Sequence, residues 1–374
     1  MARNWNQAIS QLPRAHFLQT EQWASVKQSI GWVPDFLSWN RAGELLFPSA
    51  EFSVESDLSA AALILERKIK FSSLNTGLSM LYIPKGPLFS LSVDNGQVIL
   101  ENVQNYAKKK KAIFLKIDPD IILGTGPEGG VSEMNGQGDS FRMNLQTAGW
   151  QFSPDQVQFR NTVQLCLEPD PDELLSGMKA KTRYNIRLSE KKGVNVRVGS
   201  KQDLPALYAM YAETALRDDF VIRDRNYYLY VWELFMDCQM AEPLIAEFEG
   251  VPIAAVIIFR FAKKAWYVYG MSREIHREMM PNYLLQWRAI LRAKEKGCAI
   301  YDFWGAPNQF TENDPLWGVF RFKEGFGGQI VRTVGAWDYV LKPNLYHFSM
   351  ILLPKFLDTL RLKAKRHLKT HTQT

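Results

Sequence analysis

The sequence predicts an α/β (α+β) fold of two tandem domains, each with a mixed sheet flanked by helices. Strand-like and helix-like stretches alternate along the chain, and 374 residues suffice for two hydrophobic cores. Hydrophobic residues make up 46% and charged residues 22%, which is the balance of a globular protein. We expect the first domain at residues 1–157, completed by a C-terminal segment at 336–374, and the second domain at 158–335.

The first domain is predicted to alternate helix and strand. Its expected elements are a helix at 21–30, a strand at 32–39, a helix at 95–111 and a strand at 112–118. The helix at 95–111 is amphipathic, and its lysines lie at the C-terminal end, where the helix dipole favours cations. The Gly-rich stretch 124–139 is interpreted as a surface loop.

The second domain has the clearer pattern. Asp170, Pro171 and Glu173 predict a helix that begins with a capping box, directly after a strand at 161–169. The other expected elements are helices at 204–216 and 226–238, three successive strands across 243–271, a helix at 281–297 and a strand at 299–305. This order resembles that of an acetyltransferase-like (GNAT) domain, and the first half follows the same plan more loosely. We therefore expect two GNAT-like domains side by side.

Charge, cysteines and apolar runs narrow the class of protein. The formal net charge of +6 suits a polyanionic partner. The three cysteines lie far apart, so neither a disulfide framework nor a zinc site is expected, and no other metal-ligand spacing occurs. The N-terminus lacks the apolar region of a signal peptide, and no run of about 18 apolar residues could span a membrane, so we expect a cytoplasmic protein.

Two absences bear on the chemistry. GNAT enzymes hold the pyrophosphate of coenzyme A on a Gly-rich loop between the meander and the next helix. The corresponding stretch, 271–285, contains no glycine, so a coenzyme A donor is disfavoured and no cofactor is expected. The five histidines form no evident Ser/His/Asp set, which makes histidine-based acid–base catalysis improbable.

The segment 179–193 carries a basic ridge. On a helix, Lys179, Arg183 and Arg187 fall at positions i, i+4 and i+8 of one face. Two interpretations fit: a solvated helix face, or a surface that contacts nucleic-acid phosphates with a steep salt dependence.

Aromatic residues and cations alternate in the segment 314–328. A strand would place Phe320 and Phe322 on one face and Arg321 and Lys323 on the other. One interpretation is a core strand with an outward basic face. The other is a lysine aimed into a cleft, where it stabilises the negative charge that develops in acyl transfer.

Several stretches together resemble the FemABX family of aminoacyl-tRNA-dependent peptidyltransferases, which branch peptidoglycan. The resemblance covers most of the chain and lies in residues 17–32, 114–120, 179–194, 281–290, 301–307 and 318–328. It implies transfer of an amino acid from charged tRNA to the side-chain amine of the stem peptide, with the precursor bound in the first domain and the tRNA end near the second. The long helical arm of staphylococcal-type members has no counterpart between Lys192 and Val221, so this short form resembles the members that add a single residue.

The resemblance also implies roles for individual residues. Lys27 and Arg223 resemble the contacts to the phosphates of the precursor, with Arg217 or Arg225 as alternatives to Arg223. The other matching positions are Asp118 near the precursor, Tyr227 (or Tyr228) as the aromatic residue that follows Arg223, Tyr269 in the cleft, and Lys323 at the reacting centre with Phe322 beside it. No Ser or Cys has a base partner in view, so direct attack of the amine without a covalent enzyme intermediate is expected.

The C-terminal segment 343–374 joins apolar residues to a basic end. It fits either a peripheral contact with the inner face of the membrane or a packed helix with a solvated end. Three rival functions stay open: an acetyl-coenzyme A-dependent N-acetyltransferase, a non-catalytic protein that binds RNA or a membrane surface, and a Fem-like enzyme that acts on another amine. The sequence leaves open the amino acid, the tRNA, a nucleotide-linked (UDP-MurNAc-peptide) or lipid-linked acceptor, and the oligomeric state.

Overall fold

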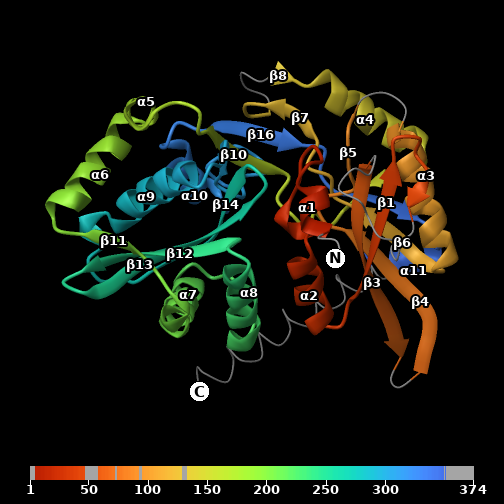
Figure 1. The fold of residues 1–374 in the computed structure, drawn as a ribbon, viewed down its shortest axis with the longest axis horizontal. Coiled ribbons are helices and arrows are strands. Elements are labelled where there is room, and N and C mark those ends of the chain that lie inside the picture. The colour runs from red at the N-terminus through yellow and green to blue at the C-terminus, as the bar shows by residue number, and fades with distance from the viewer. Residues whose placement is uncertain are drawn as a thin grey trace, which may run out of the picture.

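The computed structural model describes residues 5–46, 58–71, 74–91, 95–128, 133–348 and 350. Within these residues the strands form two mixed sheets, of eight and nine strands, that make two lobes side by side (Figure 1). Helices flank both sheets, so the predicted fold class is confirmed.

The first sheet has the strand order β2-β1-β3-β4-β6-β17-β9, and β5 pairs with β3. Its strands are β1 (Val33–Asn40), β2 (Leu45–Leu46), β3 (Leu58–Phe71), β4 (Leu74–Ile83), β5 (Leu88–Phe89), β6 (Ala112–Ile117), β9 (Gln151–Phe152) and β17 (Trp337–Val340). The helices of this lobe are α1 (Trp5–Ile9), α2 (Glu21–Ser29), α3 (Asn95–Lys109), α4 (Gly136–Thr147) and α11 (Pro343–His347). The 3-10 helix η1 (Phe17–Gln19) leads into α2, where the Thr20 side chain caps the first turn.

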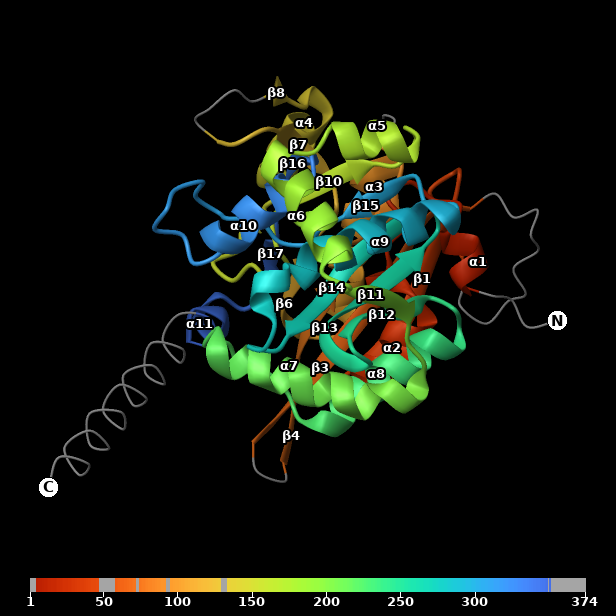
Figure 2. The same cartoon turned by 90° about the vertical axis from the view of Figure 1, so that its left-hand side faces the viewer.

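The second sheet has the order β11-β12-β13-β14-β15-β10-β16-β7-β8. Its strands are β7 (Ile122–Thr125), β8 (Glu133–Met134), β10 (Asn161–Cys166), β11 (Asn195–Val198), β12 (Ala241–Phe248), β13 (Val251–Phe261), β14 (Lys264–Ser272), β15 (Ile300–Asp302) and β16 (Gln329–Thr333). The helices are α5 (Pro171–Ser176), α6 (Ala180–Lys191), α7 (Leu204–Arg217), α8 (Arg225–Asp237), α9 (Pro281–Glu295) and α10 (Trp317–Glu324), with 3-10 turns η2 (Lys201–Asp203) and η3 (Arg277–Met279). Helices α6 and α9 cover one face of this sheet, and α7 and α8 the other (Figures 1 and 2).

The two lobes exchange strands. β7 and β8 lie before residue 157 but pair into the second sheet, while β17, from the C-terminal segment, inserts between β6 and β9 of the first sheet. The division at residues 157 and 158 therefore stays a prediction about folding units. The predicted membrane contact of segment 343–374 falls largely outside the described residues, which end with α11 and residues 348 and 350.

Two sequence interpretations were wrong. The segment 314–328 contains a helix, α10, so the buried Phe320 and Lys323 share its inner face while Arg321 is exposed. The alternation of aromatic and basic residues has a period of two, but the burial follows the 3.6-residue period of a helix. The Gly-rich stretch 124–139 is also not all loop: Asn135 caps α4, and Gly138 allows that helix to approach β7 closely.

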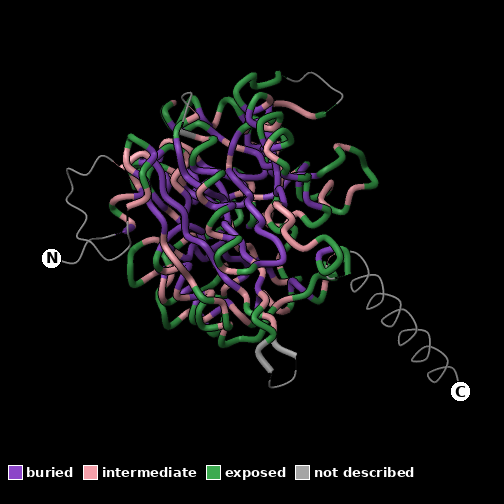
Figure 3. The backbone as a smooth tube through the Cα atoms, turned by 90° about the vertical axis from the view of Figure 1, so that its right-hand side faces the viewer, coloured by how far each residue is buried: buried purple, intermediate pink, exposed green. Residues whose placement is uncertain are grey.

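One hydrophobic core joins the lobes. It combines residues of α1, η1, α2 and β3 with residues of α7, α8 and β12–β14. The buried residues are concentrated in the central strands (Figure 3). Because the shared core is apolar and fully packed, the lobes hold a defined relative position, which fixes the side chains at their junction.

Candidate functional site

Four of the predicted site residues form one cluster, which we name the paired-cation cluster: Lys27, Arg223, Tyr227 and Tyr269. Lys27 lies in the last turn of α2 in the first lobe, and its ammonium is 4.5 Å from the centre of the Trp23 ring. Arg223 lies two residues before the start of α8 in the second lobe, and its guanidinium is 4.9 Å from the Tyr227 ring. Burial, and then the nearby positive charge of Arg223, lower the pKa of Lys27 to about 8. The cluster thus holds two like charges close together.

Tyrosines form the wall of this cluster. The Tyr269 ring centre lies 5.8 Å from that of Tyr211 and 5.7 Å from that of Tyr228. Tyr227 packs edge-on against Tyr228 at 5.3 Å. Burial raises the pKa of Tyr269 well above its ordinary value, so its hydroxyl stays a neutral hydrogen-bond donor. The sequence left open whether Tyr227 or Tyr228 belongs here, and the structure brings both into the cluster.

A register shift in β14 separates the paired-cation cluster from a second cluster, which contains Lys323. Ile257 pairs with Tyr269 and Ile258 with Tyr267, so β14 carries one extra residue at this point. Tyr269 consequently packs against the core shared by the lobes, and Tyr267 against the core under α9 and α10. Gly270 is required here, because a Cβ atom would lie 1.9 Å from the Tyr267 hydroxyl oxygen.

Lys323 belongs to the second cluster, on the Tyr267 side of β14. Its side chain is 6% exposed, and its ammonium donates hydrogen bonds to the carbonyl oxygens of Trp304 and, at 2.7 Å, Gly305. Burial lowers the pKa of Lys323 to about 7, against the opposing effect of Asp302. Phe322 is half-buried beside it, with its ring 5.0 Å from that of Tyr283. Lys323 is thus a buried amine poised near neutral pH.

The carbonyls that hold Lys323 come from a tight turn after β15. Trp304 and Gly305 have φ angles of +53° and +70°, and a left-handed conformation is uncommon for a residue as bulky as tryptophan. The carboxylate of Asp302 accepts a hydrogen bond of 2.9 Å from the Trp304 backbone N–H and another from the Thr162 hydroxyl. Asp302 therefore stabilises the turn whose carbonyl oxygens bind the Lys323 ammonium.

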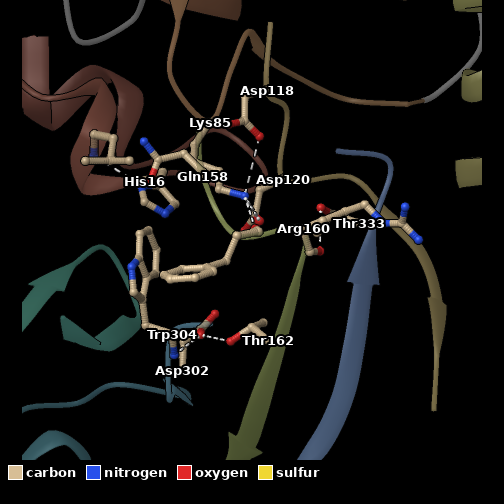
Figure 4. A network of polar contacts seen from close by, with 12 residues as sticks. His16, Lys85, Asp118, Asp120, Gln158, Arg160, Thr162, Asp302, Trp304 and Thr333 are labelled. Atoms are coloured by element: carbon tan, nitrogen blue, oxygen red, sulfur yellow. Dashed lines mark hydrogen bonds and ion pairs between the residues drawn. The ribbon is translucent and has the colours of Figure 1, made fainter. Parts of the chain in front are cut away.

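Asp118 is the residue that was predicted to lie near the precursor. It is 1% exposed and lies in a buried charge network at the lobe junction (Figure 4). Its carboxylate accepts a hydrogen bond from Tyr82 at 3.2 Å and pairs with Lys85 at 3.7 Å. Burial raises the pKa of Asp118, although Lys85 opposes the shift. Asp118 therefore contacts the lobe junction through its hydrogen bond with Tyr82 and its ion pair with Lys85.

The network continues across the junction with alternating charges. Lys85 pairs with Asp120 at 3.5 Å, Asp120 with Lys264 at 3.4 Å, and Lys264 with Asp302 at 2.8 Å. Burial would raise the pKa of Asp120, but Lys264 and Lys85 outweigh burial and hold it well below its usual range. A chain of polar contacts thus connects Asp118 in the first lobe to the turn beneath Lys323 in the second.

Sequence reasoning missed Lys85, Asp120, Lys264, Asp302 and Trp304. Two local signals point to part of this set: Asp118 and Asp120 follow directly after a buried strand in FLKIDPD, and Asp302 lies at a strand end in YDFWGAP. Polar residues at strand ends meet at the edges of sheets, where sites form. The two lysines carry no such signal, because each lies in an ordinary turn or strand start.

The basic ridge is only partly open to a ligand. Lys179 is the residue before α6 and forms an ion pair of 2.6 Å with Glu324, the neighbour of Lys323. Arg183 donates to the backbone carbonyls of Ser176 and Met178, which stabilises the turn between α5 and α6. Arg187 is exposed. The helix is confirmed, and its contact with tRNA stays a proposal.

The described residues hold no group of three or more His, Cys, Asp or Glu that could bind a metal ion. No helix in the same ranges is long and apolar enough to cross a membrane.

The two lobes of mixed sheet and helix, with the paired-cation cluster between them and the buried Lys323 in the second lobe, have the architecture of a tandem GNAT-like protein. The profile of the FemAB family matches residues 2–248 and 237–353, so the chain belongs to the FemAB family. It is similar to the lipid II:glycine glycyltransferase of Staphylococcus epidermidis, with 23% identity over 96% of this chain and 95% of that protein. The Staphylococcus aureus protein of the same name is 22% identical over the same shares.

The fold has a solved counterpart. The crystal structure of FemX aligns with a TM-score of 0.77 and 21% identity over 92% of this chain and 96% of that chain. The likeness confirms the arrangement of the two lobes as a fold, independently of the function of either protein.

Proposed function

We propose that this protein transfers an amino acid from aminoacyl-tRNA to the stem-peptide side-chain amine of a peptidoglycan precursor, in the synthesis of interpeptide bridges of the cell wall. The observation that carries the proposal is the paired-cation cluster, which brings Lys27 and Arg223 from different lobes to one place. It occurs in a FemAB chain whose relatives are named for glycine transfer to lipid II.

Lys27 and Arg223 hold the diphosphate of the acceptor. A guanidinium suits two-point contact with phosphate oxygens, and a lysine supplies a point charge. Burial lowers the pKa of Lys27 to about 8, and repulsion by Arg223 adds to this shift while the cluster is empty. A bound diphosphate offsets the repulsion and favours the charged form of Lys27, so binding takes up protons above pH 8. The half-buried Tyr227 and Tyr269 complete the acceptor site as apolar walls with neutral hydroxyls.

The reaction is a direct acyl transfer. The acceptor amine attacks the ester carbonyl of the aminoacyl-tRNA, a C–N bond forms, and the ester C–O bond to the ribose breaks as the amine loses its proton. The ammonium of Lys323 has three N–H groups, and two of them are engaged by the Trp304 and Gly305 carbonyls. The third is available to the oxyanion of the tetrahedral intermediate. Phe322 supplies an aromatic surface for the donor end.

The remaining predicted residues act around this centre. Asp118 positions Tyr82 and Lys85 at the lobe junction. Arg187, on the exposed face of α6, contributes to contact with the tRNA backbone, while Lys179 and Arg183 stabilise the N-terminal end of that helix. The donor is a co-substrate, and no metal or further cofactor enters the scheme.

The test is transfer with purified components. The chain is incubated with tRNA charged with labelled glycine, alanine or serine, and with either nucleotide-linked or lipid-linked pentapeptide. The product is measured by mass spectrometry of the peptide. We expect one added residue on the side-chain amine. If neither acceptor is modified with any charged tRNA, and neither protects the chain against thermal unfolding, the proposal fails.

A further inference from the structure

The turn between α7 and α8 presents apolar side chains to solvent beside the paired-cation cluster. Val221 is 98% exposed and Leu216 is 85% exposed, and Phe220 is also exposed. These three residues lie within six positions of the chain, whereas the exposed apolar residues that need no explanation are scattered singly. We define Leu216, Phe220 and Val221 as the apolar turn.

The apolar turn is a built feature. The Phe220 N–H donates to the Ala215 carbonyl at 3.1 Å, and Asp219 takes a left-handed φ of +53°, which ends α7. The Phe220 ring lies 5.7 Å from that of Tyr211, and Ile222 packs against the shared core. These anchors on both sides of Val221 leave its side chain pointing away from the protein.

The position of this turn relative to the cations decides what it contacts. Val221 precedes Arg223 by two residues, so their Cα atoms are at most about 7 Å apart. A lipid-linked diphosphate lies in the head-group layer, and apolar groups at that level enter about 5–10 Å into the boundary with the acyl chains. A protein that holds such a diphosphate at Arg223 therefore brings Val221 to the depth at which an apolar side chain leaves water.

We propose that the apolar turn is a membrane-contact surface, which inserts into the bilayer beside the diphosphate of a lipid-linked acceptor. The inference rests on the proposed function, because it takes Lys27 and Arg223 as the diphosphate site. It deepens that function by selecting a lipid-linked acceptor over a soluble nucleotide-linked one.

The charges around the turn indicate how it binds. Residues 216–225 contain three arginines and three aspartates, so their formal charge is zero. Arg217 pairs with Asp218 at 2.9 Å and with Glu274 at 3.3 Å, and Asp224 caps α8. Insertion consequently depends on apolar burial and on the diphosphate, with little dependence on anionic lipid. Contact through a basic tail would show the opposite dependence.

The experiment is flotation of the full chain with phosphatidylcholine vesicles, with and without a polyprenyl diphosphate. The double variant Leu216→Ser, Val221→Ser is compared with wild type, and Met143→Ser, a 55% exposed residue of α4 in the other lobe, serves as the matched control. We expect wild type and the control to float with the vesicles that contain diphosphate. The double variant should bind them at least about tenfold more weakly, because apolar burial of one such side chain is worth that factor.

Two readouts separate this inference from the proposed function. With a short-chain, water-soluble form of the lipid-diphosphate-linked acceptor and no vesicles, the double variant should turn over as wild type does, because its fold and its cation site are intact and no bilayer takes part. Equal flotation of wild type and double variant, or absence of wild-type flotation, overturns the membrane contact whatever the activity. If wild type floats but has no transferase activity, and the double variant does not float, the membrane contact is supported and the proposed function is refuted.

Discussion

Replacement of Lys323 by methionine tests the reacting centre most directly. Methionine keeps the length of the side chain but removes the charge and the N–H groups. If the third N–H of Lys323 stabilises the oxyanion, its loss raises the barrier by about 2.7–4 kcal/mol, which is a fall of about 10²–10³ in kcat. The measurement is single-turnover transfer from charged tRNA at saturating acceptor, and the acceptor KM should stay close to wild type.

The pH dependence gives a second, independent readout of Lys323. Its pKa is lowered to about 7, so it is charged below that pH and loses its charge as the pH rises. The charged fraction of Lys323 falls about tenfold per pH unit above 7. The ratio of wild-type to Lys323→Met turnover should fall with it and so show an alkaline limb, because deprotonation of the acceptor amine affects both chains equally. A ratio that lacks this limb, or a variant that turns over within a few-fold of wild type, would refute the role of Lys323.

The same substitution has a predictable effect on stability. In the folded state the pKa of Lys323 lies below its unfolded value of 10.5, so wild type loses stability as the pH falls from about 10.5 to about 7. Lys323→Met lacks this loss but leaves two buried carbonyls unpaired, each at a cost of about 1–3 kcal/mol. Thermal unfolding at several pH values should therefore show the variant gaining on wild type towards pH 7, which separates a catalytic defect from a folding defect.

Four further outcomes are expected. Lys27→Met should raise the acceptor KM about tenfold to a hundredfold. In titration calorimetry the acceptor binds wild type more weakly as the pH rises through 8, and the variant should lack this dependence. Asp302→Asn should lower kcat with little change in KM and shift the alkaline limb to lower pH, because the negative charge raises the pKa of Lys323; the exposed Asp139→Asn is the control. Gly138→Ala should destabilise the fold by at least about 1–3 kcal/mol in urea titrations, because its Cβ would lie 2.0 Å from the Ile122 carbonyl oxygen, whereas Gly136→Ala, with nothing within 4 Å, should not. Arg187→Ala should weaken tRNA binding and reduce the dependence of log affinity on log salt by about one; an unchanged slope removes Arg187 from the tRNA surface.

The parts of the fold that the sequence predicted are those with local causes. The capping box of Asp170 and Glu173 forms as expected, with both hydrogen bonds in place. The hairpin turns of the meander fall where Gly250 and Ala262 take positive φ angles. Segment 318–324 was misread because an alternating pattern of rings and cations fits a strand as well as it fits one buried face of a helix. Only the packing of α10 under β14 decides between the two.

The charge network at the lobe junction lies beyond local reasoning. Lys264 and Asp120 are 144 residues apart in the chain, and no spacing rule connects them. The family resemblance supplied Asp118 as a single residue. Its partners follow only from the way the end of β6 meets the start of β14. A buried lysine in a strand looks like any other strand residue until the opposite lobe is in place.

The charge network also favours one relative position of the two lobes. Buried ion pairs add little net stability compared with apolar contacts, because removing charges from water offsets their attraction. An alternating series from Lys85 through Asp120 and Lys264 to Asp302 instead disfavours other relative positions of the lobes, since any slip would leave a charge buried and unpaired. Asp302 then transmits that position to the Trp304 turn and so to Lys323. The proposed function therefore predicts that acceptor and donor are aligned where the lobes meet, by the charges that are least exposed.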